Sequence, residues 1–314
     1  MKNFKRYLPL LANIFTAFIS GFVYLFMKTG LQIVQYDTVK YLAFRFTVGF
    51  VVLTLLLITK LQNVNYKNKP FFLLLFCGAL NPLVSQVLEA TAVGYAPTSQ
   101  IAVIFSLQPI LIVGLSALIN RELPTKRQVF FMMVSVAGVL LINLIGGQVT
   151  GGTWYGLVLI LCAVLVISAQ RVFVRRATGR FTAFEIIYVT TGMGAFGFSC
   201  LTLFSHAAEG RLGFFFDGLM NPGFAVSILY MGIMSCVVGF LCSTYATGRL
   251  PIAVSSSTAM LGTVITVLVG VFVLGEVFRP IDIAGTAITL LGIIGMSLSY
   301  NVRKTNRFME KKDS

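Results

Sequence analysis

The stretch from Pro97 to Glu122 reads PTSQIAVIFSLQPILIVGLSALINRE, an apolar helix that opens on proline and ends in an acid. The chain contains this pattern twice. The second copy runs from Pro251 to Glu276, reads PIAVSSSTAMLGTVITVLVGVFVLGE and keeps the spacing of 25 positions between proline and glutamate. The two copies lie 154 positions apart, and small residues outside them follow the same offset. A pattern repeated in this way indicates an internal duplication.

The composition is that of a membrane protein. Of 314 residues, 57% are apolar and 11% are charged, whereas about 25% charged residues is usual in soluble domains. Apolar runs of roughly 18 or more residues recur along the chain, and each is long enough to cross a bilayer core of about 30 Å as a helix. We therefore predict an all-α integral membrane protein with ten transmembrane helices, at about residues 9–28, 38–59, 70–90, 97–119, 128–146, 153–173, 183–204, 222–246, 251–274 and 282–300.

Lysine and arginine orient the chain, because they are enriched in cytoplasmic loops. With the N-terminus inside, the inner loops and ends hold 18 of these residues and the outer loops hold 4. Both termini are therefore expected in the cytoplasm, with the chain in the plasma membrane. The same clusters explain the net charge of +14 as attraction to anionic lipid, so no nucleic-acid partner is expected.

Each half of the chain holds five predicted spans, an odd number, so the second half must be inverted relative to the first. We place the first repeat at 1–148, the second at 149–302 and a basic cytoplasmic tail at 303–314. Glu122 would then face the cytoplasm and Glu276 the outside. An inverted duplication creates a pseudo-two-fold axis in the membrane plane, and secondary transporters bind their substrate at that axis.

The duplicated motif resembles the drug/metabolite transporter superfamily, specifically its ten-helix EamA-like members. The run Phe105–Gln128, FSLQPILIVGLSALINRELPTKRQ, is similar to the family's fourth helix, and Ala259–Gly285, AMLGTVITVLVGVFVLGEVFRPIDIAG, is similar to its ninth. The resemblance implies a central cavity walled by helices one, three, four, six, eight and nine. It also implies transport by alternating access, which in this family usually runs in the export direction. The chain departs from the family pattern in having Thr263 where the ninth helix often has proline, and in lacking the first-helix tryptophan.

The third span carries the strongest set of candidate binding residues, Asn81, Gln86 and Glu89, because polar groups inside a membrane are costly and suggest function. Pro82, Gln86 and Glu89 share one helix face, and Pro82 is expected to break the helix near Asn81. Glu89 could couple proton movement to transport or pair with a cationic substrate. The alternative is that Glu89 lies about one turn from the outer end and reaches headgroup water.

The fourth and ninth spans supply further polar candidates. Gln100 and Gln108 are eight residues apart, about two helical turns, and so are expected on one stripe. Pro109 would free a carbonyl near Gln108 that could bind a ligand. In the ninth span Ser256 is the matching candidate, although small hydroxyl residues also serve as packing contacts between helices.

Isolated charges inside or near the spans complete the candidate set. Arg45 could bind an anionic group such as a carboxylate, or extend to the interface. For Arg171 extension to the interface is the expected outcome, and His206 is expected to be a solvated histidine without a partner. The positions assigned to helix ends or gates are Pro97, Pro109, Glu122, Pro251 and Glu276.

We therefore predict a secondary transporter that moves a small organic solute by alternating access. An amino acid or related metabolite, in the export direction, is favoured because a zwitterion could use both Glu89 and Arg45. The alternatives are export of cationic drugs or other metabolites, and a non-transporting scaffold or receptor. We expect no enzymatic activity, catalytic residue, metal or cofactor, and the chain lacks an ATP-binding Gly-x-x-x-x-Gly-Lys-Ser/Thr loop. Besides the solute and the bilayer, the sequence leaves open whether two copies associate as a homodimer, although Gly138 and Gly292 in the fifth and tenth spans would permit close helix contact.

Overall fold

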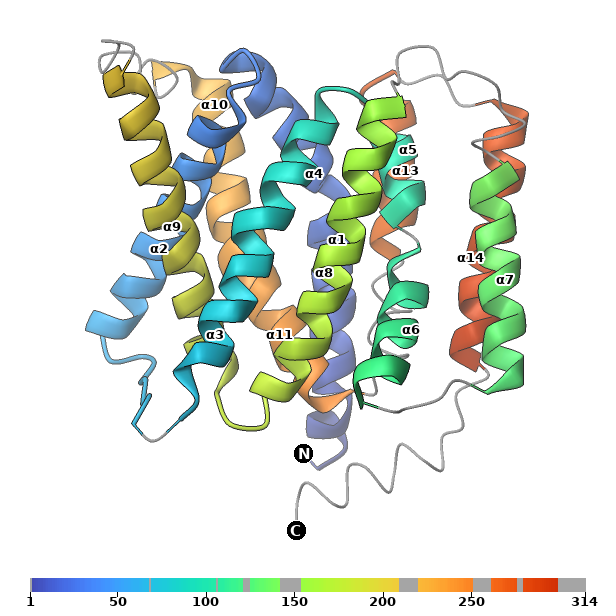
Figure 1. Cartoon of the computed structure of the whole chain (residues 1–314), viewed down its shortest axis with the longest axis horizontal. Coiled ribbons are helices and arrows are strands. Elements are labelled where there is room, and N and C mark those ends of the chain that lie inside the picture. The colour runs from blue at the N-terminus through green and yellow to red at the C-terminus, as the bar shows by residue number, and fades with distance from the viewer. Residues whose placement is uncertain are drawn as a thin grey trace.

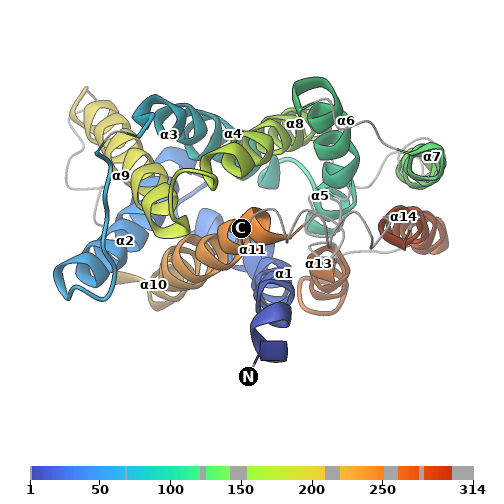
Figure 2. The ribbon, with the colours of Figure 1, turned by 90° about the horizontal axis from the view of Figure 1, so that it is seen from below.

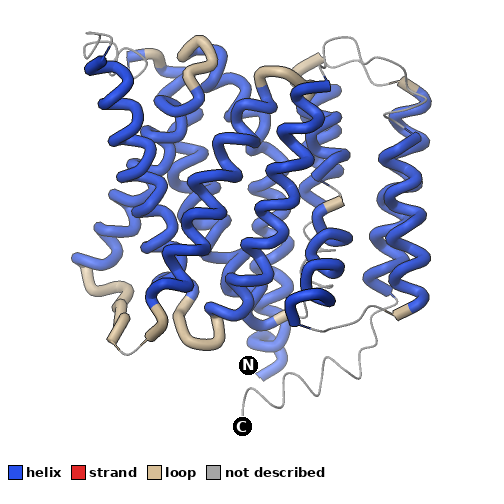
Figure 3. The backbone as a smooth tube through the Cα atoms, in the orientation of Figure 1, coloured by secondary structure: helices blue, strands red, loops and turns tan. Residues whose placement is uncertain are grey.

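A computed structural model describes residues 2–67, 69–105, 107–120, 125–141, 154–208, 220–250, 261–275 and 279–298. All regular structure within these ranges is helical (Figure 3). The first half holds α1 (Lys2–Ile33), α2 (Thr38–Ile58), α3 (Phe71–Gly78), the π-helix η1 (Ala79–Val84), α4 (Ser85–Val93), α5 (Thr98–Phe105), α6 (Gln108–Asn120) and α7 (Lys126–Leu140). The second half holds α8 (Trp154–Ala177), α9 (Ala183–Ala208), α10 (Pro222–Leu229), the π-helix η5 (Tyr230–Gly239), α11 (Phe240–Arg249), α13 (Leu261–Phe272) and α14 (Pro280–Leu298).

These elements follow the ten predicted spans. Seven segments of the described chain are long and apolar enough to cross a membrane, and α7 and α14 contain shorter apolar stretches. The third span consists of α3, η1 and α4 in succession, and the eighth consists of α10, η5 and α11. The described residues therefore include helical segments from each of the ten predicted spans, and the chain is a multi-pass membrane protein.

Two proline-linked breaks shape the first half. At Asn81, directly before Pro82, the backbone leaves the helical region with φ −143° and ψ 115°, as the sequence predicts. The fourth span, predicted at about 97–119, is confirmed as one apolar segment, Gln100–Ile119, within which α5 ends at Phe105 and α6 begins at Gln108. Pro109 has no N–H to donate to the carbonyl of Phe105, so the helix cannot continue through it.

The two halves run in opposite directions, as predicted. Figure 1 shows α1 starting at the lower side and α8, its counterpart in the second half, starting at the upper side. Here "lower" means the side where α1 begins. The packing follows the same symmetry: α1 packs against α13 as α8 packs against α5 and α6, and α1 packs against α11 as α8 packs against α4.

The contact between α7 and α14 shows where the pseudo-two-fold axis runs. These two helices lie side by side at one edge of the bundle (Figure 2). Ser135 Oγ donates to the carbonyl of Thr289 at 3.2 Å, and Thr289 Oγ1 donates to the carbonyl of Ser135 at 3.4 Å. The backbone at Gly138 lies against Thr289, and that at Gly292 lies against Ser135. Because both pairs are 154 positions apart, each helix makes the same contact with the other, as a two-fold axis requires.

A second contact of this kind joins α2 and α9 at the opposite part of the bundle. Gly49 lies against Thr191, and Gly194 lies against the ring of Phe46. Both Gly49–Gly194 and Phe46–Thr191 are separated by 145 positions, which is therefore the repeat offset in this pair of helices. The pseudo-two-fold axis passes through the α7–α14 and the α2–α9 interfaces. Residues that line the space between these two interfaces can therefore occur in equivalent pairs, one from each repeat.

Gly138 and Gly292 do make close helix contact, and pairing of two copies stays a prediction. Both glycines are used inside one chain, where an added Cβ at Gly138 would meet backbone atoms of α14 and one at Gly292 would meet backbone atoms of α7. A second copy could meet only the outer faces of these helices, where Phe130, Met133 and Leu291 are exposed.

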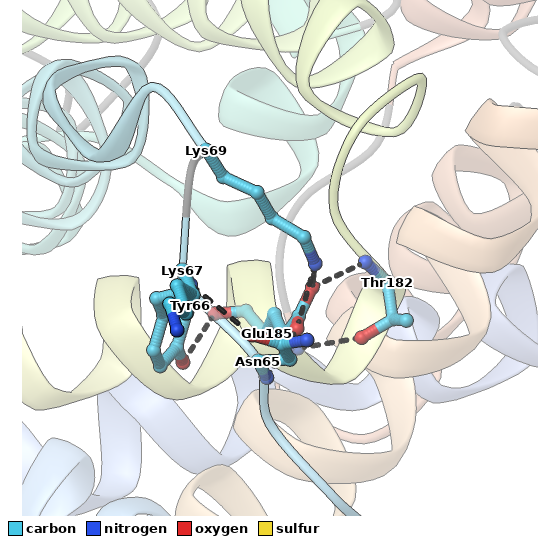
Figure 4. Close-up of polar contacts among 6 residues, drawn as sticks. All are labelled: Asn65, Tyr66, Lys67, Lys69, Thr182 and Glu185. Atoms are coloured by element: carbon cyan, nitrogen blue, oxygen red, sulfur yellow. Dashed lines mark hydrogen bonds and ion pairs between the residues drawn. The ribbon is translucent and has the colours of Figure 1, made fainter.

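A polar cluster fixes the lower end of α9 to the loop between α2 and α3 (Figure 4). Thr182 and Glu185 form a capping box: the Thr182 N–H donates to the Glu185 carboxylate at 2.8 Å, and the Glu185 N–H donates to Thr182 Oγ1 at 3.2 Å. Lys69 Nζ and the N–H of Asn65 donate to the same carboxylate, at 2.8 and 2.7 Å. Burial and the nearby Glu185 carboxylate raise the pKa of Tyr66 to about 12, so its neutral hydroxyl donates to the Glu185 carbonyl.

The close approach of α7 and α14 predicts that even one methyl group will disturb it. In Gly138→Ala the new Cβ would lie 2.6 Å from the carbonyl oxygen of Gly285, so the helices must separate. We expect the variant to be destabilised by about 1–3 kcal/mol, read as a lower unfolding temperature in detergent. Gly114→Ala is the control, because its Cβ would meet nothing within 4 Å. Equal unfolding temperatures for the two variants would contradict the predicted contact.

Candidate functional site

A cavity of about 210 Å³ lies inside the bundle. Its walls come from α1, α2, η1, α4, α5, α6, α8, α9, η5, α11 and α13, which together represent eight of the ten spans. The resemblance implied walls from spans one, three, four, six, eight and nine, and all six contribute described residues. The structure adds α2 and α9, because these helices cross at the axis and face the centre of the bundle.

The cavity lies on the pseudo-two-fold axis. Several lining residues occur as equivalent pairs, one from each repeat: Arg45 with Thr190 at the offset of 145, and Glu89 with Ser243 and Gln86 with Phe240 at the offset of 154. The pairs differ in character, since the first repeat supplies an arginine and a carboxylate where the second supplies hydroxyl groups. The site is therefore symmetric in backbone position and asymmetric in charge.

The cavity extends to the lower side of the bundle. Val174, Ile186 and Thr247 line it, and each lies within three residues of the lower end of its helix. At the other limit the lining includes Tyr24 and Glu89, which contact each other within the upper half of α1 and the upper part of α4.

One chain of hydrogen bonds holds the charged residues of the upper part. Tyr24 Oη donates to Glu89 Oε1 at 2.9 Å, and Gln86 Nε2 donates to Glu89 Oε2 at 2.9 Å. Arg45 donates to Gln86 Oε1 at 2.6 Å and to Ser235 Oγ at 3.3 Å. We call these five side chains the arginine–glutamate network. They come from α1, α2, α4 and η5, so the network ties both repeats together.

Gln86 is the central residue of the network, because it stands between the two charges. Arg45 is 2% exposed and Glu89 is 6% exposed, and a buried charge is costly without partners. The Gln86 amide accepts from the cation with its oxygen and donates to the carboxylate with its nitrogen, so the two ions are joined without direct contact. Phe46 adds its ring, whose centroid lies 5.3 Å from the Arg45 guanidinium carbon.

For Glu89, Arg45 and Arg171 the sequence offered two locations, the cavity or the membrane interface, and the structure places all three at the cavity. Glu89 is buried in the cavity wall and does not reach headgroup water. Arg45 is also buried there, so extension to the interface is excluded. For Arg171 the expected extension is wrong: the residue lines the cavity, because its position on α8 faces the axis.

The other predicted candidates divide into four groups. Asn81, Gln86 and Gln108 line the cavity. Gln100 is buried but is absent from the lining, since the break between α5 and α6 ends the expected stripe. Two prolines lie at helix starts: Pro97 directly precedes α5, and Pro109 lies in the first turn of α6. The remaining candidates lie outside the described residues: Glu122, Pro251, Ser256 and Glu276.

Some lining residues were not singled out from the sequence. Tyr24 and Ser235 complete the network, and the repeat offset of 154 places Ser235 opposite Asn81.

His206, expected to be solvated and without a partner, is half-buried at the upper end of α9. Its Nε2 lies 3.7 Å from Asp37 Oδ2, which connects α9 to the turn before α2.

Comparison with known proteins gives consistent matches. The chain matches the EamA-like transporter family twice, over residues 8–144 and 154–298. It is 28% identical over 298 residues to the uncharacterized transporter YcxC of Bacillus subtilis (strain 168), with 95% of each chain covered. It is 24% identical over 221 residues to a probable terminal-alkyne amino-acid exporter of Streptantibioticus cattleyicolor, with 69% of this chain and 70% of that protein covered. A solved structure with a TM-score of 0.65 and 16% identity covers 96% of this chain and 98% of its own, and shows a shared fold.

The position of Gln86 predicts that its amide supports folding as well as the site. In Gln86→Leu, Arg45 and Glu89 each lose a buried partner, and leaving buried polar groups unsatisfied costs about 1–3 kcal/mol. We expect a lower unfolding temperature in detergent than for the control Val84→Leu, whose side chain is exposed on the same span. An unfolding temperature in Gln86→Leu equal to that of the control would show that the amide does not bridge the two charges.

Proposed function

Because the chain belongs to the EamA-like transporter family, we propose that it is a secondary transporter that exports an amino acid or a related zwitterion by alternating access. The observation that carries this proposal is the arginine–glutamate network in the wall of the cavity on the pseudo-two-fold axis. In that network a buried cation and a buried carboxylate are held apart by a neutral amide.

An amino acid offers the complementary pair of charges. Its α-carboxylate can bind Arg45, whose planar guanidinium suits carboxylate geometry, and its ammonium group can bind Glu89. Two buried polar atoms of the cavity-lining residues lack hydrogen-bond partners, Arg45 Nε and Asn81 Oδ1. A carboxylate accepts and an ammonium group donates, so one zwitterion can satisfy both atoms when the site adjusts to it.

The direction of transport follows from the side to which the cavity extends. The lower side carries described basic residues at the loops and helix ends, among them Lys60, Lys67, Arg176, Arg180 and Arg249. Such residues are enriched on the cytoplasmic side of the plasma membrane, and both termini are proposed to lie there. A cavity that extends to the cytoplasmic side is suited to collect solute for export, and one relative is named a probable amino-acid exporter.

Glu89 is the proposed coupling residue. Among the described lining residues it is the only carboxylate, and it lies where the upper part of the cavity ends. Protonation would remove its charge and its acceptor role toward Gln86 and Tyr24, and so loosen the contact between α1 and α4. A proton entering from the opposite side could in this way favour the state that is open to that side.

The same lining weighs against the other candidate solutes. A cationic drug would meet two arginines, Arg45 and Arg171, and a single carboxylate, so its own charge would be repelled. An acid without an amino group would leave Glu89 without a counterpart. The zwitterion is the class that uses every charged group of the network.

Removal of the Arg45 charge should strongly slow transport, whereas removal of an exposed charge next to the same span should not. Proteoliposomes loaded with an amino-acid mixture are expected to release one chemical class, detected by mass spectrometry, and Arg45→Gln should lower that efflux at least about tenfold, since it takes away a buried charge partner. Lys60→Gln is the control, because Lys60 is exposed beyond the end of the same helix. Equal efflux from the parent and Arg45→Gln would contradict the proposed role of Arg45, and no efflux from the parent would contradict amino-acid transport.

Neutralising Glu89 should remove the coupling of transport to the proton gradient without stopping the movement of amino acid across the membrane. In Glu89→Gln we expect the increase in efflux caused by an imposed pH gradient to disappear, while exchange of amino acid without a gradient continues at a lower rate, because the amide oxygen can still accept from the ammonium group but carries no charge. The substitution keeps the shape of the side chain and an oxygen that can accept from Tyr24. A mutant that still responds to the gradient as the parent does would exclude Glu89 as the coupling group.

A further inference from the structure

The lower part of the cavity holds polar side chains that the arginine–glutamate network does not use. Arg171 and Gln170 from α8 and Gln108 from α6 all line it. Among the described residues, these three side chains have no hydrogen bond or ion pair, in contrast to the hydrogen-bonded network above them. Their donors and acceptors are therefore available to a solute in the cavity.

The neighbouring arginines of the same helix show that Arg171 is exceptional. Arg175 donates to the carbonyl of Leu250 at 3.1 Å, and Arg176 donates to the carbonyl of Ile119 at 2.9 Å. These two arginines satisfy carbonyls at or next to the C-terminal ends of α11 and α6, a common structural role for arginine. Arg171 lies one turn further into the membrane on the side facing the axis, so its charge is directed at the cavity instead.

The charges of the cavity do not balance. The described lining holds two arginines, Arg45 and Arg171, and one carboxylate, Glu89, so basic groups outnumber acidic groups by one. The stretch 251–260 of the ninth span reads PIAVSSSTAM and contains no ionisable side chain that could offset it. Uncompensated charge is unfavourable in a membrane interior, so occupation by a solute with one net negative charge would be favoured over occupation by a neutral one.

We propose, on the basis of the amino-acid transport proposed above, that Arg171 with Gln170 and Gln108 forms a second carboxylate subsite, which makes the preferred solute an acidic amino acid. The α-amino acid group binds at the arginine–glutamate network, and the side-chain carboxylate binds at Arg171. The two glutamine amides donate further hydrogen bonds to that carboxylate. With such a solute bound, the charges of the cavity and its occupant sum to zero.

The test compares acids with their isosteric amides. Proteoliposomes are loaded with equimolar glutamate and glutamine, and in a second set with aspartate and asparagine, and efflux is read by mass spectrometry. The parent is expected to release the acid at least about tenfold faster than the amide. Arg171→Gln should bring this ratio close to one by slowing the acid while the amide continues, which also shows that the variant is folded.

Two further variants make the test specific. Arg180→Gln removes the same charge from an exposed position on the lower side and should leave the acid-to-amide ratio unchanged. Arg171→Lys keeps a cation in the cavity and should keep the ratio well above one. The contrast between the lysine and glutamine variants tests the charge of Arg171 apart from its packing.

The possible failures are distinguishable. A parent that releases glutamine but not glutamate would overturn the second subsite and leave amino-acid export standing. If Arg171→Gln slows glutamate and glutamine equally, Arg171 serves the α-carboxylate common to both, and the side-chain subsite is overturned. A parent that releases none of the four amino acids would contradict the proposed function itself.

Discussion

A charged side chain inside a bilayer must find its partners within the protein, and here one glutamine amide supplies a partner for two opposite charges. Gln86 accepts from Arg45 and donates to Glu89, while Ser235 and Tyr24 complete the chain on either side. Deletion of one member would leave a buried group unsatisfied, so the four helices that carry the network must stay in register. The arrangement of α1, α2, α4 and η5 around the cavity depends on this constraint.

The inverted duplication explains why the cavity lies at the centre of the bundle. The reciprocal contacts of α7 with α14 and of α2 with α9 mark a two-fold axis, and equivalent residues of both repeats line the space between them. Two similar halves can exchange conformations, which opens the cavity to one side and then to the other. Thr190 and Ser243 stand at the positions equivalent to Arg45 and Glu89, so the two charges of the arginine–glutamate network come from the first repeat.

Much of this arrangement follows from the sequence, and the parts that do not have identifiable causes. The duplicated Pro-to-Glu stretch predicts the inverted repeats, and the polar third span predicts Asn81, Gln86 and Glu89 as cavity residues. The stripe through Gln100 and Gln108 was wrong because the two residues lie in separate helices, α5 and α6, and only Gln108 lines the cavity. Arg171 was misjudged because sequence position near a helix end does not tell which way a side chain faces. The offset of 145 positions between equivalent residues of α2 and α9 could not be predicted from the sequence, because only the contacts between these helices reveal it.

The cavity extends toward the lower side, and we propose that it is the transport pathway. This proposal is tested most directly by the reactivity of a single cysteine at position 247, placed in a chain whose five native cysteines have been replaced. The measurement is the labelling rate of Thr247→Cys with a membrane-impermeant maleimide added to one side of sealed vesicles at a time. The account predicts labelling from the cytoplasmic side, slowed by saturating transported amino acid. Labelling from the outer side in the absence of solute, or a rate that solute does not change, would contradict it.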